Sequence, residues 1–207
     1  MRRAWLDARG RYPREASKLA VSVAVGGLRI EDWIDRLRSN DEGTVWLLQM
    51  SSRVLNRKGE LRGDKLVGAW LRQLAAAAMG EVLGGVLVAR DASLALAPLE
   101  QGAARAQLET LAALWRSNLD RPLPVATKTA LAHLTGGDAR ATYDGGADVE
   151  GRSRPEVADP CLARLWPEFG RLAAAGGWPV VAEALYGPLV AWLKEGVTVT
   201  LFDGDEA

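Results

Sequence analysis

The sequence has one cysteine, Cys161, and one histidine, His133, among its 207 residues. One cysteine cannot form an internal disulfide, and the pair cannot supply the ligands of a Cys/His zinc site. His133 lies in an apolar helical pattern and Cys161 follows Pro160, so we expect a packed histidine and an inert, buried thiol, not a catalytic pair. The scarcity of both residues excludes disulfide-stapled and Cys/His zinc scaffolds.

The sequence also lacks a long apolar run. The longest uncharged segment, Leu172–Ala182, is far shorter than the roughly 18 apolar residues that a membrane-spanning helix needs. The first residues, Met-Arg-Arg-Ala-Trp, do not have the apolar stretch of a signal peptide. We therefore expect a soluble, cytoplasmic protein with no membrane partner.

An excess of either charge is absent, because 26 basic residues balance 26 acidic ones. The general electrostatic signature of a stand-alone nucleic-acid binder is therefore missing, and any contact with nucleic acid must be local. The segment 53–65 is the densest basic candidate, with five basic and two acidic residues. Such a run is either a solvated loop or a phosphate-binding loop. The candidate DNA-binding residues are Arg53, Arg57, Lys58 and Arg62.

Phosphate-binding glycine motifs are absent as well. Five Gly-Gly pairs occur, but none has the spacing or the Gly-Lys-Ser/Thr sequence of a phosphate-binding loop. The eight tryptophans include four on apolar helical faces, where packing in a core is the expected role. Nucleotide binding of the P-loop type therefore has no support.

The first half of the sequence predicts a small sheet. Residues 1–17, which carry five arginines around Pro13, predict a helix fragment and a loop. Apolar alternation and β-branched residues predict strands over 19–25 and 44–51. Residues 28–37 fit a strand or a short helix, and we favour a strand, which joins the other two in one antiparallel meander. Apolar positions at helical spacing predict a helix over 63–79 that stops at Gly80, followed by one or two strands within 82–96.

The second half is predicted to be mostly helical. Helical patterns cover residues 100–118, 127–134, 160–174 and 179–193, whereas the Gly/Asp-rich residues 135–159 predict a long loop. Strands followed by helices favour an α+β fold over a doubly wound one.

The order of the first-half elements resembles the core of PD-(D/E)XK nucleases. In that core, an acidic residue and an Asp-x-Lys pair at the end of the next strand hold the catalytic metal. Residues 47–53, Leu-Leu-Gln-Met-Ser-Ser-Arg, align with the family's Leu-Leu-Asp-Tyr-Lys-Ser-Asn. This places Gln49 at the position of the Asp and Ser51 at that of the Lys, while Asp35 matches the upstream acid and Gln73 the helix glutamine. One remaining carboxylate cannot replace a site of several oxygen ligands around Mg²⁺. The resemblance therefore implies a degenerate nuclease core with no catalytic residue and no metal ligand.

Further motifs are similar to the C-terminal domain of RecC, the gamma subunit of exodeoxyribonuclease V. They are Trp115-Arg-x-x-Leu-x-Arg-Pro-Leu-Pro-x-x-x-Lys-Thr-Ala-x-Ala, Tyr143-Asp-Gly, Pro160-Cys-Leu-Ala-Arg-Leu-Trp and Leu185-Tyr-Gly-Pro-Leu. The resemblance extends over about Leu19 to Leu193. It implies a RecC-like C-terminal nuclease-like domain over 18–207, preceded by a remnant of another segment over 1–17, as expected for a piece of a longer subunit.

The RecC resemblance implies a scaffold that has no activity of its own. Such subunits hold RecB-like and RecD-like partners, split duplex DNA with a pin and guide one strand. We expect no cofactor in this chain, since ATP and Mg²⁺ are used by the partner subunits. The elements that cover the sheet in the family do not fit into residues 1–17, so the resemblance also implies that the apolar face of strand 19–25 is exposed. An active metal-dependent nuclease and an unrelated helical interaction module are the alternatives.

Overall fold

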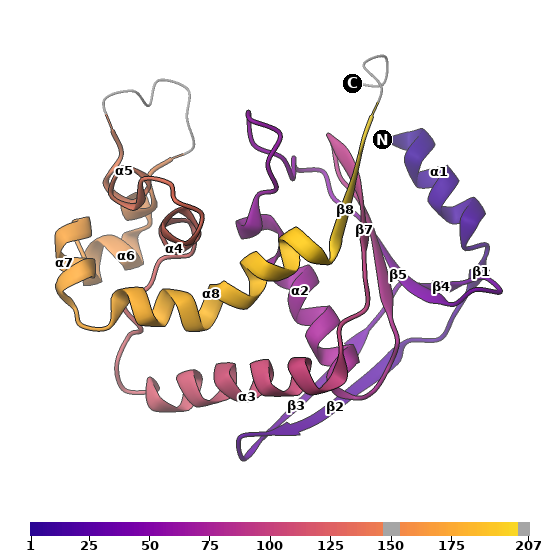
Figure 1. Ribbon diagram of the computed structural model, residues 1–207, viewed down its shortest axis with the longest axis horizontal. Helices are drawn as coiled ribbons and strands as arrows, with labels where there is room; N and C mark the ends of the chain where they lie inside the picture. The colour runs from indigo at the N-terminus through magenta and orange to yellow at the C-terminus, as the bar shows by residue number, and fades with distance from the viewer. Residues whose placement is uncertain (147–153, 203–207) are drawn as a thin grey trace. The chain divides into compact units, whose positions relative to one another are not determined.

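The computed structural model describes residues 1–146 and 154–202, which fall into two compact units. Unit 1 comprises Met1–Ala113 and Trp192–Ala207, and unit 2 comprises Leu114–Ala191. Two long helices, α3 (Gln101–Ser117) and α8 (Trp178–Glu195), each have residues in both units. The fold is α+β, with strands in the first half and mostly helices after it (Figure 1).

Unit 1 contains a six-stranded mixed sheet with the order β1-β4-β5-β6-β7-β8. Neighbouring strands are antiparallel except β5 and β6, which run parallel and are connected through helix α2 (Gly63–Ala78). The strands are β1 (Arg14–Glu15), β4 (Leu37–Ser39), β5 (Thr44–Gln49), β6 (Gly84–Val88), β7 (Ala92–Leu96) and β8 (Val197–Leu201). The predicted strands within 82–96 are confirmed as β6 and β7. Strand β8 was not predicted, although Val-Thr-Val-Thr-Leu has the alternation of a strand.

The hairpin of β2 (Leu19–Val25) and β3 (Leu28–Ile34) forms a separate two-stranded sheet. Gly26 and Gly27 have φ angles of +55° and +75°, which suit a tight two-residue hairpin turn. The predicted strand over 28–37 is divided, because Arg36 adopts a left-handed φ of +57° and β4 begins after it. The prediction of one continuous antiparallel meander is therefore wrong, since the two antiparallel pairs belong to different sheets.

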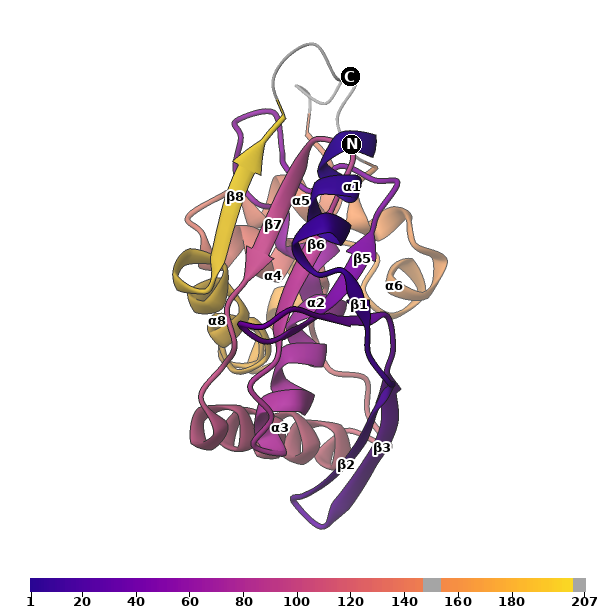
Figure 2. The same ribbon diagram turned by 90° about the vertical axis from the view of Figure 1, so that its right-hand side faces the viewer.

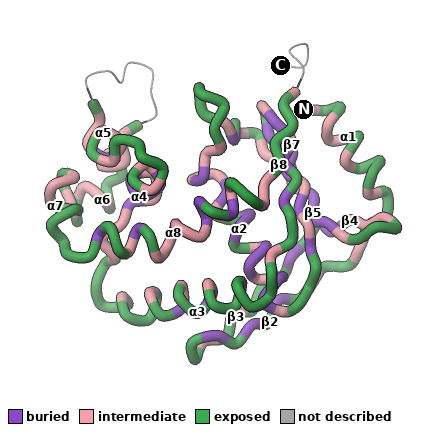
Figure 3. The backbone as a smooth tube through the Cα atoms, viewed as in Figure 1, coloured by how far each residue is buried: buried purple, intermediate pink, exposed green. Residues whose placement is uncertain are grey.

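The apolar face of the hairpin is covered, so the expectation that it is exposed is wrong. Val21, Val23 and Val25 retain only 4%, 2% and 3% of their accessible surface, and β2 contacts α2. The backbone N–H of Ser22 lies 3.3 Å from the Sδ atom of Met79, which follows α2. The helix that the sequence predicts over 63–79 thus lies against β2, and Figure 3 colours buried positions of the backbone purple.

Helices cover both faces of the six-stranded sheet. Helix α1 (Arg2–Arg11) lies on one face and contacts β6, whereas α2 lies on the opposite face (Figures 1 and 2). In α2 the apolar positions Leu66, Trp70 and Leu74 are buried, as their helical spacing predicts. Gly80 follows the helix with a φ of +86°, a conformation that glycine adopts without strain. The core of unit 1 therefore lies between α2, the hairpin and the sheet.

Unit 2 is built of short helices around a small aromatic core. Besides the parts of α3 and α8 that it includes, the described elements are α4 (Thr127–Leu134), α5 (Ala139–Asp144), a 3₁₀ turn (Glu156–Ala158), α6 (Pro160–Leu165) and α7 (Phe169–Ala174). Ala126, Tyr143, Leu172 and Trp178 are buried together, with Phe169 packed against them. The Phe169 and Trp178 rings meet edge to face at 5.4 Å, a favourable aromatic geometry.

Two predictions for this region need correction. The predicted helix over 160–174 is two helices, because Pro167 disfavours helical geometry at Trp166, whose φ and ψ are −136° and 88°. The predicted loop over 135–159 contains α5 and the 3₁₀ turn, and its residues 147–153 lie outside the described residues. The side chain of Asp138 begins α5 by accepting a hydrogen bond of 2.9 Å from the Ala141 N–H.

Candidate functional site

The basic segment after β5 is a tightly hydrogen-bonded loop. The carboxylate of Asp91 accepts hydrogen bonds from the backbone N–H groups of Val54 (2.9 Å) and Leu55 (3.1 Å). At the tip, the Asn56 side-chain oxygen accepts hydrogen bonds from the N–H groups of Lys58 and Glu60, at 2.8 and 3.0 Å. The fully buried Val54 side chain anchors the start of the loop in the core. Its backbone is thus fixed by the fold.

The four basic candidates of this loop differ in their surroundings. Arg57 and Lys58 lie exposed at the tip, and Arg53 lies exposed at its base. Arg62 forms an ion pair of 3.1 Å with Asp64, and its side chain retains 30% exposure. Arg53, Arg57 and Lys58 are therefore exposed to solvent. Arg62 is instead paired with the Asp64 carboxylate, in the first turn of α2.

The residues aligned with nuclease metal ligands are spread over several elements. Asp35 is exposed after β3, 3.9 Å from the Arg36 Nε atom. Gln49 is the exposed last residue of β5, and Ser51 is exposed in the turn that follows. Among the described residues, no hydrogen bond or ion pair joins any two of the aligned positions.

Gln73, the helix glutamine of the same set, forms hydrogen bonds that connect α2 to the sheet. Its side chain is almost fully buried, with 1% exposure. With the amide oriented to suit its neighbours, its nitrogen donates to the Leu83 carbonyl at 2.6 Å, and its oxygen accepts from the Gly85 N–H and the Trp46 Nε1–H at 3.2 Å. A Cβ on Gly85 would lie 2.6 Å from the Trp46 ring, so only glycine fits there. Gln73 thereby links α2 to β5 and β6 inside the core.

Gln49 lines a cavity of about 580 Å³ in unit 1. The cavity is formed by α1, the β1 region, β4 and β5. Its lining residues are Trp5, Arg9, Glu15, Ala16, Lys18, Arg36, Leu37, Arg38, Leu47 and Gln49. Four side chains are cationic and one is a carboxylate. Asp35 does not line the cavity, whereas its neighbour Arg36 does.

Sequence patterns do not predict the basic residues of this cavity as site residues. Arg9 belongs to the arginine-rich residues 1–17, whose pattern predicts only a helix fragment and a loop. Lys18 and Arg36 lie 9 and 27 positions after Arg9 in the sequence, so only the fold brings them beside Arg9. The five arginines in residues 1–14 are the sequence feature that could have indicated a basic site here.

Other candidate chemistry has little support in the structure. Cys161 is exposed, so the expectation of a buried thiol is wrong. His133 is exposed, although its ring lies against that of Trp178 with 4.8 Å between centroids, so the expectation of a packed histidine is confirmed only in part. Within residues 1–146 and 154–202, no group of three or more His, Cys, Asp or Glu side chains could hold a metal ion. In the same residues, no helix is long and apolar enough to cross a membrane.

The residues of the basic loop and of the cavity all belong to unit 1. In this unit α2 connects the parallel strands β5 and β6 of the mixed sheet. A family model described as the RecC C-terminal domain matches residues 1–138. The chain therefore belongs to the RecC C-terminal domain family. RecC is a subunit of exodeoxyribonuclease V, so the chain is part of a RecBCD-type complex that acts in DNA repair and recombination.

The match covers about two thirds of the chain, and it includes residues 1–17. The proposed boundary between residues 17 and 18 stays a prediction. A search of curated proteins finds none that matches the chain. The family match and the six-stranded sheet exclude the alternative of an unrelated helical interaction module.

Proposed function

We propose that this chain is a non-catalytic scaffold and DNA-guiding domain of a RecBCD-type helicase–nuclease. In this role it docks RecB-like and RecD-like motor subunits and helps to split duplex DNA, while ATP and Mg²⁺ are used by the partners. The mixed sheet, with β5 followed by α2 and the parallel β6, supports a degenerate nuclease core. Asp35, Gln49, Ser51 and Gln73 mark its decayed positions.

The charge of the cavity beside Gln49 carries the proposal. A nuclease of this type needs several carboxylate oxygens around a divalent cation. Here the strand ends in an amide, and the cavity has Arg9, Lys18, Arg36 and Arg38 against one carboxylate, that of Glu15. Glu15 is itself paired with Arg38 at 3.3 Å. Such a cavity repels a metal cation and attracts phosphate, so it suits DNA binding without cleavage.

The test is a cleavage assay on the purified full chain. Linear duplex DNA and single-stranded DNA are incubated with Mg²⁺ or Mn²⁺, and no cleavage above the buffer background is expected. The Asp35→Ala variant serves as the matched control, because Asp35 is the only aligned position that keeps a carboxylate. Metal-dependent cleavage by the wild-type chain that is lost in Asp35→Ala would favour the active nuclease instead.

The scaffold part of the proposal has its own measurement. The chain is co-expressed with RecB-like and RecD-like subunits and analysed by size-exclusion chromatography with light scattering. We expect it to elute with at least one motor subunit. A monodisperse monomer that binds neither subunit would overturn the scaffold role without bearing on cleavage.

A further inference from the structure

The cavity beside Gln49 has the composition of a single-stranded nucleic-acid site. Cations in such sites contact the backbone phosphates, and an aromatic side chain stacks on a base. Trp5 and Arg9 both line the cavity, and a spacing of four residues places them on one face of α1. We propose that this cavity binds one nucleotide of single-stranded DNA, with the base against Trp5 and flanking phosphates against Arg9, Lys18 and Arg36. The choice of DNA rests on the proposed function.

The cations of the cavity divide into one that is structural and three that can meet a ligand. Arg38 donates to the Tyr12 carbonyl at 2.6 Å and to the Pro13 carbonyl at 2.5 Å, and its side chain is only 12% exposed. Among the described residues, Arg9 and Lys18 have no ion-pair partner. Within the described part of the chain, the Arg36 guanidinium has one ionic contact, of 3.9 Å with Asp35, and its side chain is 61% exposed.

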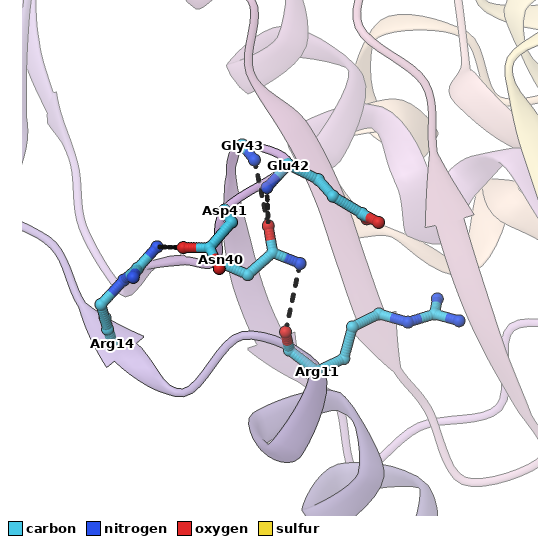
Figure 4. Close-up of polar contacts among 6 residues, drawn as sticks. All are labelled: Arg11, Arg14, Asn40, Asp41, Glu42 and Gly43. Atoms are coloured by element: carbon cyan, nitrogen blue, oxygen red, sulfur yellow. Dashed lines mark hydrogen bonds and ion pairs between the residues drawn. The ribbon is translucent and has the colours of Figure 1, made fainter.

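The helix that carries Trp5 and Arg9 is attached to the sheet at its C-terminal end. The Asn40 side chain donates to the Arg11 carbonyl at 3.2 Å and accepts from the N–H groups of Glu42 and Gly43 (Figure 4). Beside it, Arg14 and Asp41 form an ion pair of 2.9 Å. With the Arg38 contacts to Tyr12 and Pro13, these bonds fix the end of α1 against the β4–β5 turn. The cavity wall is thus formed before a ligand binds, which lowers the entropic cost of binding.

The size and the polar lining also fit a nucleotide. A volume of about 580 Å³ lies within the roughly 300–1,000 Å³ of small-ligand sites. Gln49 adds an amide that can both donate and accept hydrogen bonds, as base edges require. An aspartate at this position would place a negative charge against the phosphates. Glutamine at position 49 is therefore compatible with nucleic-acid binding, whereas the carboxylate of a metal ligand at this position would repel the phosphates.

The affinity test uses fluorescence anisotropy of the full chain with a labelled oligothymidylate over a range of salt concentrations. In Arg9→Ala/Lys18→Ala, the loss of two phosphate contacts should flatten the slope of log K against log salt by about 1.4. Arg2→Ala/Arg29→Ala removes the same charge from residues that do not line the cavity and should change the slope much less. Equal slopes for the two double variants would overturn the proposal.

The stacking part is tested by Trp5→Ala, which should weaken binding by about 5- to 150-fold, the range of one base–aromatic stack. Trp5→Phe keeps an aromatic ring that can stack on a base and should restore most of the affinity. Gln49→Asp, at an exposed position, should also weaken binding. Affinities of Trp5→Ala and Gln49→Asp equal to that of the wild type would contradict the assigned roles.

Cross-linking locates the DNA independently of affinity. An oligonucleotide with 5-iododeoxyuridine is irradiated with the full chain and the tryptic peptides are identified by mass spectrometry. We expect adducts on residues 4–9, the peptide that contains Trp5. Adducts only elsewhere, for example in the basic loop, would overturn the cavity site and leave the DNA-guiding role standing. Loss of motor-subunit binding in Arg9→Ala/Lys18→Ala with unchanged DNA binding would instead assign the cavity to an acidic segment of a partner.

Discussion

The carboxylate of Asp91, in the turn between β6 and β7, accepts a 2.9 Å hydrogen bond from the backbone N–H of Val54, which is 37 residues away in the sequence. A second oxygen of the same carboxylate accepts from the Leu55 N–H at 3.1 Å. An acidic residue thus fixes the base of the loop that carries Arg53, Arg57 and Lys58. The charged tip of the loop is solvated, but its backbone is positioned by the sheet.

Replacement of Asp91 by alanine should therefore destabilise unit 1. It leaves two partly buried N–H groups without an acceptor, which costs about 1–3 kcal/mol for each group that water cannot reach. Denaturant unfolding should show the loss, and amide exchange at Val54 and Leu55 should accelerate. Asp41→Ala is the matched control, because Asp41 is 94% exposed and its ion pair contributes at most about 1 kcal/mol. Equal stability of the two variants would contradict the role of Asp91.

The basic loop should contribute to DNA affinity through its tip. If Arg57 and Lys58 contact phosphates, Arg57→Ala/Lys58→Ala flattens the salt dependence of single-stranded DNA binding by about 1.4. Arg62→Ala should have a smaller effect on the slope, because Arg62 is paired with Asp64. Unchanged binding by the tip variant at low salt would show that the loop is only solvated.

Glu100 should stabilise α3 at neutral pH and lose this effect in acid. Its carboxylate accepts hydrogen bonds from the backbone N–H groups of Gly102 (2.7 Å) and Ala103 (2.6 Å), and these bonds lower the pKa of Glu100. A lowered pKa in the folded state means that the stabilisation is complete above the ordinary glutamate pKa of about 4.3. It is lost as the pH falls through the folded-state pKa.

The check on Glu100 is the difference in melting temperature between the wild type and Glu100→Gln as a function of pH. The difference should be largest near neutral pH and should shrink in acid. Glu42→Gln is the control, since the described structure shows no hydrogen bond or ion pair from the Glu42 carboxylate. A difference that grows as the pH falls would have the wrong sign.

Tyr143 should make unit 2 sensitive to alkaline pH. Its hydroxyl donates to the Trp166 carbonyl at 2.6 Å, and burial, with the negative charges of Glu156 and Asp144, raises its pKa. A raised pKa means that its stabilisation is complete below the ordinary tyrosine pKa of about 10 and is lost as the pH rises through the folded-state value.

Tyr143→Phe should therefore be less stable than the wild type at neutral pH by about 1–3 kcal/mol, because the Trp166 carbonyl loses its donor. The variant should also lose part of the alkaline destabilisation, as seen by urea unfolding from about pH 8 to about pH 11. Tyr12→Phe, which removes a hydroxyl with no hydrogen bond in the described structure, should leave both measurements almost unchanged. A wild type whose stability rises through this pH range would contradict the assignment.

Local sequence patterns determined the elements whose partners are near in the chain. The valine alternation at 21, 23 and 25 and the two glycines after it predict the β2–β3 hairpin, because strand period and turn chemistry are local properties. The apolar spacing of Leu66, Trp70 and Leu74 predicts α2 and its buried face in the same way. The α+β class followed from the order of these elements, and the RecC resemblance followed from residue motifs such as Pro160-Cys-Leu-Ala-Arg-Leu-Trp.

Tertiary structure alone decided which surfaces meet. The pattern of Val21, Val23 and Val25 shows that one face is apolar, but it cannot show that α2 covers that face. Strand β8 pairs with β7, whose residues lie about one hundred positions earlier in the chain, and no local signal indicates that pairing. The cavity joins Arg9, Lys18 and Arg36 from separate segments, because side-chain proximity depends on the packing of the sheet and α1 and not on spacing in the sequence.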